Sequence, residues 1–87
     1  MKLICAIVRD IDGDEVVHAL VARGYRVTRL ASTGGFLRRG NVTLLVGVED
    51  DQVSDVVEQI RSACLPAESG QHRAILFIMT LSRLERI

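Results

Sequence analysis

The stretch TRLASTGGFLRRGN, residues 28–41, decides the fold because it leads from one strand-like run directly into another, with no helix between them. The run that follows it is VTLLVGV, residues 42–48. About ten loop residues separate the two runs, whereas a plain hairpin needs roughly two to five. A loop of this length is typical of a binding segment on a rigid scaffold.

Strand-like patterns also lie on either side of this loop. Residues 2–9, KLICAIVR, form a continuous apolar run rich in branched side chains, and residues 73–81, RAILFIMTL, form another. Residues 25–31 alternate, so that Tyr25, Val27 and the stem of Arg29 share one face. Arg26, Thr28 and Leu30 share the other face. With residues 42–48, the sequence therefore predicts four strands.

Two amphipathic helices are predicted between these strands. Asp12 and Glu15 have capping-box spacing at the start of the first helix, and Gly24 suits the position just after its end. Acidic residues 49–51 open the second helix, which ends before Pro66. Its apolar positions follow a three-and-four spacing: Val53, Val56, Val57, Ile60 and Cys64.

The order β-α-β-β-α-β predicts one α+β domain over residues 1–87 with a ferredoxin-like plan. Right-handed crossovers would place both helices on one face of an antiparallel four-stranded sheet. The first and last strands are apolar on both faces, and two helices can cover only one of them. We therefore expect the second face to be buried between subunits of an oligomer.

The composition of the 87 residues restricts the classes of partner. The chain is 48% hydrophobic and 25% charged, and its formal net charge is zero, which provides no global field for nucleic acid or an anionic membrane. No apolar run reaches the ~20 residues that span a bilayer, and residues 1–8 are too short for a secretion signal, so we expect a cytoplasmic protein. Cys5 and Cys64 have no metal-ligand or disulfide-framework spacing.

The sequence lacks residues that the motifs of nucleotide hydrolysis, calcium binding and acid–base catalysis require. Gly35 and Gly40 have the spacing of a P-loop, but Asn41 stands where that motif requires lysine. Glu15 replaces the glycine of a calcium loop. His18 and the other histidine, in residues 66–72, have no nucleophile or acid at a recognisable spacing. The sequence therefore predicts no enzyme, no metal and no cofactor.

The loop retains the chemistry of a nucleotide site. A glycine pair can present backbone N–H groups to phosphate, arginine can bind phosphate through a forked contact, and an aromatic ring can stack on a base. The residues concerned are Arg26, Thr28, Gly34, Gly35, Phe36 and Asn41. The alternative is a glycine turn with solvated arginines, in which Phe36 packs into the core.

Three segments resemble the PII-like cyclic-di-AMP receptor proteins of the nitrogen regulatory PII-like superfamily. They are KLICAIVRD (2–10), YRVTRLASTGGFLRRGN (25–41) and VTLLVGVEDDQVSDVVEQI (42–60). The resemblance runs from the first residue to about Ser62, and RAILFIMTL is similar to the last strand of that family. It implies a non-enzymatic signal-transduction protein, a homotrimer of ferredoxin-like subunits that binds cyclic di-AMP at subunit interfaces.

The resemblance also implies roles for individual residues. Arg26 and Thr28 would meet the phosphates and sugar, and Asn41 and Gly47 would line the adenine pocket. Gly35, Phe36 and Leu37 would close over the ligand, and Ala31 and Phe77 are further candidates.

The chain departs from the family pattern at three places. Gly24 stands where the family often has Asn, and Arg86 lies near where a Gln often helps to read the base. Residues 66–72 are short, whereas the family inserts a long second loop there. An alternative is therefore a PII-like protein-interaction module that uses its 32–41 loop on a partner protein and has lost or changed its nucleotide ligand. Arg38 and Arg39 would then be partner contacts.

Overall fold

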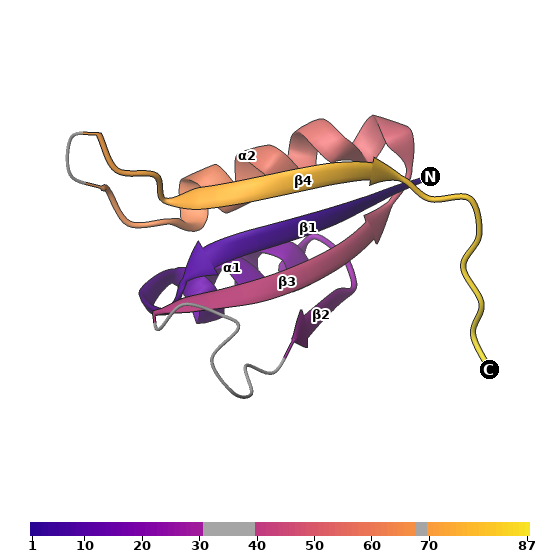
Figure 1. Cartoon of the computed structure of the whole chain (residues 1–87), viewed down its shortest axis with the longest axis horizontal. Coiled ribbons are helices and arrows are strands. Elements are labelled where there is room, and N and C mark those ends of the chain that lie inside the picture. The colour runs from indigo at the N-terminus through magenta and orange to yellow at the C-terminus, as the bar shows by residue number, and fades with distance from the viewer. Residues whose placement is uncertain (31–39, 68–69) are drawn as a thin grey trace.

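The computed structural model describes residues 1–30, 40–67 and 70–87. The elements follow the order β-α-β-β-α-β, with one short 3-10 turn before the second helix (Figure 1). They are β1 (Lys2–Arg9), α1 (Asp10–Ala22), β2 (Val27–Leu30), β3 (Asn41–Val48), η1 (Asp50–Gln52), α2 (Val53–Ala63) and β4 (Ala74–Thr80). The predicted α+β fold is confirmed.

The strands form a single sheet in the order β2-β3-β1-β4, and each neighbouring pair is antiparallel. β1 and β3 are central, and Ile4 of β1 pairs with Val46 on one side and with Ile78 on the other. Figure 1 shows both helices on the same face of the sheet, behind the strands. This is the ferredoxin-like arrangement that the element order predicts.

The hydrophobic core lies between the sheet and the two helices. Because side chains alternate along a strand, Ile4, Ala6 and Val8 of β1 share the helix-covered face, and all three are fully buried. The same face carries Leu44, Val46 and Val48 of β3, and the helices contribute Val16, Leu20, Val56 and Ile60. Burial on this scale is the main favourable contribution to folding.

The opposite face of the sheet, here called the open face, has neither α1 nor α2 against it (Figure 1). It carries the alternate residues of each strand, and along β4 these are Ile75, Phe77 and Met79. Their side chains are 51%, 53% and 45% exposed. An apolar surface of this kind is unusual for the outside of a small domain.

Helix α1 begins three residues earlier than its capping pattern predicts, with Arg9 and not Asp12 at the N-cap position, because Asp12 has another role. Asp12 is fully buried. Its carboxylate accepts hydrogen bonds from Arg9 Nε at 2.7 Å and from the backbone N–H of Leu65 at 2.9 Å. The residue therefore joins the start of α1 to the segment that follows α2.

Helix α1 ends as the sequence predicts, with Gly24 just after its last turn. The N–H of Gly24 donates to the carbonyl of Val21 at 2.9 Å, and that of Tyr25 donates to Leu20 at 3.1 Å, which is the Schellman pattern. Gly24 has φ +89°, a conformation that residues with a Cβ rarely adopt. Because the Tyr25 amide is used in this turn, β2 begins at Val27 and not at the predicted residue 25.

We expect Gly24→Ala to lower the free energy of unfolding by about 1–2 kcal/mol, because alanine is strained at positive φ. Gly24→Asn should cost less, since asparagine tolerates this region. The measurement is urea denaturation at fixed protein concentration. Gly47→Ala is the control, because a Cβ there would meet only Met1 Cε, at 4.0 Å. Equal stability of the two alanine variants would contradict the requirement for glycine at position 24.

Candidate functional site

Arg26, Thr28 and Gly47, three of the residues predicted to bind a ligand, line one hollow on the open face. Thr28 pairs with Leu45 and Val27 with Val46, so continuing this register by one residue sets Arg26 opposite Gly47. The hollow has a volume of about 640 Å³. This is within the usual size range of small-molecule sites.

The C-terminal segment, residues 81–87, forms another wall of this hollow. It begins beside the first residue of the chain, where the N–H of Leu81 donates to the carbonyl oxygen of Met1 at 3.0 Å. Leu81, Leu84 and Arg86 then line the hollow. We call this space the open-face hollow; it is lined by Arg26, Thr28 and Gly47 from the β2–β3 side and by Leu81, Leu84 and Arg86 from the C-terminal segment.

Gly47 leaves room at the base of the open-face hollow. The sequence predicts a close approach by a ligand or another backbone at this glycine. Among the described residues, the only atom within 4 Å of a Cβ built there is Met1 Cε, at 4.0 Å. The absent side chain therefore opens space in which a flat ligand group could lie against β3.

Asn41 does not line the open-face hollow. It is the first residue of β3, opposite Arg9, whereas Gly47 lies near the other end of the same strand. Six strand residues correspond to roughly 20 Å. Phe77 is on the open face but also outside the hollow. The predicted residues Gly35, Phe36 and Leu37, with Ala31, lie outside the described residues.

Several residues of the hollow are absent from the predicted site. Leu3 and Leu45 could have been found, because strand alternation assigns them to the same face as Thr28. Gln52 of η1 and Leu84 of the C-terminal segment carry no such signal. Their positions depend on how η1 and the chain end pack against the sheet.

Comparison with known proteins identifies the family. A family model described as "Cyclic-di-AMP receptor" matches residues 1–84. The chain belongs to the cyclic-di-AMP receptor family. The match extends beyond residue 62 and includes β4 and most of the C-terminal segment, and it supports a role as a signalling receptor.

A solved structure supports the fold of this family member. A protein from Pediococcus pentosaceus ATCC 25745, described as functionally unknown, is similar to this receptor with 30% sequence identity and a TM-score of 0.79. The alignment covers 99% of this chain and 96% of the other chain. The similarity therefore extends over the whole domain.

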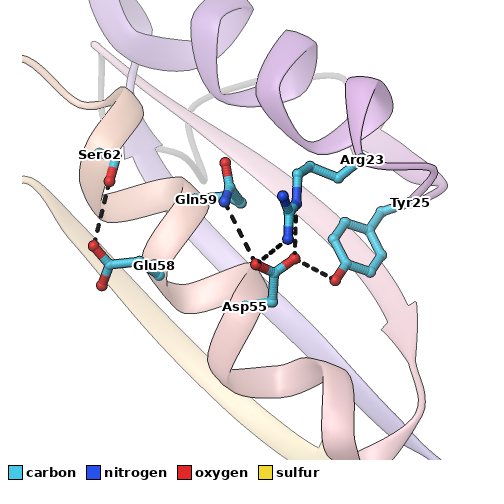
Figure 2. Close-up of polar contacts among 6 residues, drawn as sticks. All are labelled: Arg23, Tyr25, Asp55, Glu58, Gln59 and Ser62. Carbon is cyan, nitrogen blue, oxygen red and sulfur yellow. Dashed lines mark hydrogen bonds and ion pairs between the residues drawn. The ribbon is translucent and has the colours of Figure 1, made fainter.

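A polar cluster beside the open-face hollow fixes the turn that leads into Arg26 (Figure 2). Asp55 of α2 accepts hydrogen bonds from Arg23 Nε at 3.0 Å, Arg23 NH2 at 2.6 Å and the Tyr25 hydroxyl at 2.5 Å. Gln59, one turn further along α2, makes a longer contact of 3.5 Å. Because Gly24 and Tyr25 line the hollow, this cluster connects α2 to the wall of the open-face hollow.

The same contacts shift two pKa values. The hydrogen bond from Tyr25 lowers the pKa of Asp55, and the charge and hydrogen bond of Arg23 lower it further. The hydrogen bond to Asp55 raises the pKa of the Tyr25 phenol. Both shifts favour a charged carboxylate that accepts from a neutral phenol near neutral pH.

Within the described ranges, no three His, Cys, Asp or Glu side chains are grouped so that they could hold a metal ion. In the same part of the receptor, neither helix has the length and apolar character of a membrane span.

We expect Asp55→Asn to lower the melting temperature of the receptor at pH 7, with an effect that disappears in acid. Because the folded pKa of Asp55 lies below its unfolded value of about 3.9, its stabilising contribution is full above that value. It is lost as the pH falls through the folded pKa. In thermal melts between pH 7 and pH 2.5, the difference in melting temperature between the two proteins should therefore stay constant down to about pH 4 and shrink below it.

Glu15→Gln, at an exposed position on α1, is the matched control for loss of one carboxylate. It should change the melting temperature little at any pH. A constant difference between Asp55→Asn and the unmodified receptor down to pH 2.5 would contradict an ionic role for Asp55.

Proposed function

We propose that this chain is a non-enzymatic, cytoplasmic receptor that binds cyclic di-AMP in the open-face hollow, at the interfaces of a homotrimer. The observation that carries the proposal is the convergence of Arg26, Thr28 and Gly47 on one hollow. Arg26 would bind phosphate through its forked guanidinium, and the Thr28 hydroxyl would meet the sugar or phosphate. Gly47 would admit the flat adenine ring.

The open side of the hollow supports a site shared between subunits. One chain supplies Arg26 and Gly47 at one end of the open face, and Asn41 lies roughly 20 Å away at the other end of β3. A second copy packed on the open face would enclose the ligand and could bring its own Asn41 to it. Gly35, Phe36 and Leu37 stay predictions from the sequence, because they lie outside the described residues.

The open face also supports self-association. Ile75, Phe77 and Met79 are each about half exposed on it, while Leu3, Cys5 and Ile7 of β1 are partly covered. Burial of apolar surface stabilises by roughly 25 cal/mol per Å². We propose that further copies of this chain cover the open face, since the same face would then supply both the interface and the ligand site.

Calorimetry and thermal shift with cyclic di-AMP, cyclic di-GMP, ATP and AMP test the ligand. We expect cyclic di-AMP to bind selectively and to raise the melting temperature by mass action. Arg26→Ala should weaken that binding by about ten- to a hundredfold, because it removes charge-assisted hydrogen bonds to phosphate.

Arg29→Ala is the matched control for Arg26→Ala. Arg29 lies in β2, three residues after Arg26, but its guanidinium donates to Asp14 of α1 at 3.0 Å, on the helix-covered side. Its removal should leave the affinity unchanged. Absence of binding by all four nucleotides would overturn the proposal. If a partner protein were then captured in a manner that requires Arg38 and Arg39, the protein-interaction alternative would replace it.

Light scattering after size-exclusion chromatography tests the assembly. We expect a trimer for the unmodified chain and a smaller species for Phe77→Asp, because a charge on the open face would be costly to bury in an interface. Ile11→Asp is the control, since Ile11 is 67% exposed on α1, away from that face. A stable monomer of the unmodified chain would contradict the trimer and the shared site.

A further inference from the structure

The arginines of the described chain fall into two groups by their hydrogen bonds. Most donate to an oxygen of the protein: Arg9 to Asp12, Arg23 to Asp55, Arg29 to Asp14, Arg61 to Glu58, Arg73 to the carbonyl of Arg61, and Arg83 to Glu85. Within residues 1–30, 40–67 and 70–87, Arg26 and Arg86 have no such partner. These two arginines both line the open-face hollow.

Among the described residues that line the hollow, none has a side-chain carboxylate that could neutralise these two arginines. Its lining, within the described residues, combines the two guanidinium groups with apolar side chains, glycines, the Thr28 hydroxyl, Tyr25 and Gln52. The nearby Asp55 is already engaged by Arg23 and Tyr25. Two like charges facing one space without a counter-charge are unfavourable until an anion enters.

Arg86 faces the hollow together with Leu81 and Leu84 of the C-terminal segment. Leu84 and Arg86 line it, whereas Arg83 and Glu85 do not and are paired with each other. The hydrogen bond from Leu81 to Met1 fixes the start of the segment beside the sheet. Arg86 therefore reaches the hollow from a wall separate from the β2 edge that carries Arg26.

We propose that Arg86 is a ligand-binding residue, and that the hollow binds a ligand with two phosphate groups, one held by Arg26 and the other by Arg86. The proposal rests on the proposed function, in that the open-face hollow is taken as the nucleotide site. A guanidinium has only donors, in a rigid fork that matches the oxygens of a phosphate. Two separate forks suit two separate phosphates, which is the charge pattern of a cyclic dinucleotide.

Calorimetry on the full chain tests whether Arg86 binds a phosphate. The two ligands are cyclic di-AMP, which has two phosphates, and cyclic AMP, which has one. We expect Arg86→Ala to weaken cyclic di-AMP binding by about ten- to a hundredfold and to make its affinity less dependent on salt. The loss of affinity for cyclic AMP in the same variant should be smaller. Arg83→Ala is the matched control, because it removes an arginine of the same segment that is paired with Glu85.

Arg86→Lys and Arg86→Gln separate the role of charge from that of a base contact. Lysine keeps the charge without the fork and should retain part of the affinity, whereas glutamine should bind as weakly as alanine. A glutamine variant that binds as tightly as the unmodified chain would overturn the proposal in favour of a base contact. Equal binding by Arg86→Ala and Arg83→Ala would also overturn it.

Failure of the proposed function gives a different result from failure of this inference. If the unmodified chain binds cyclic di-AMP and Arg86→Ala does so equally well, only the role of Arg86 is lost. If the unmodified chain does not bind cyclic di-AMP, the same variants are measured with cyclic di-GMP and ADP, which also carry two phosphates. Binding of either that depends on Arg86 would support the two-phosphate site without cyclic di-AMP, and binding of neither would overturn both proposals.

Discussion

A single constraint shapes this molecule: two helices cover one face of a sheet whose central strand is apolar on both faces. In β1, Ile4, Ala6 and Val8 are buried against the helices, while Leu3, Cys5 and Ile7 face the other way and are only partly covered. Apolar surface left in water is a cost that association can remove. The ligand site and the interface that we propose therefore share the open face, because the helices leave no room for either on the other face.

Two carboxylates hold the helices in the positions that this arrangement requires. Asp12 accepts from Arg9 and Leu65 at one end of α1, and Asp55 accepts from Arg23 and Tyr25 at the other. A carboxylate that accepts several hydrogen bonds fixes the groups around it more firmly than apolar packing does, since each bond has a direction. The second carboxylate sets the turn immediately before Arg26, so helix packing and the geometry of the open-face hollow are coupled.

The sequence was sufficient for the fold and for the strand wall of the open-face hollow. The apolar run of β1 predicts its bounds residue for residue, and alternation predicts that Arg26 and Thr28 share a face. The start of α1 was wrong, because a buried Asp12 that accepts from a distant amide has the same local pattern as a helix cap. Gln52 and Leu84 could not be predicted, because irregular segments have no periodicity that indicates what they contact.

The pairing of arginines with carboxylates bears on recognition. Five of the eight described arginines form an ion pair within the protein, so their charges contribute little to the field far from the molecule. Three described arginines have no carboxylate partner: Arg73, which donates to the carbonyl of Arg61, and Arg26 and Arg86, which lie on two walls of one hollow. If the open-face hollow is the ligand site, as we propose, long-range attraction of anions would be weak, and selection would depend on contacts made after the ligand has entered. The proposed site would then discriminate by the number and spacing of phosphates, because each guanidinium gains only from an oxygen within its own reach.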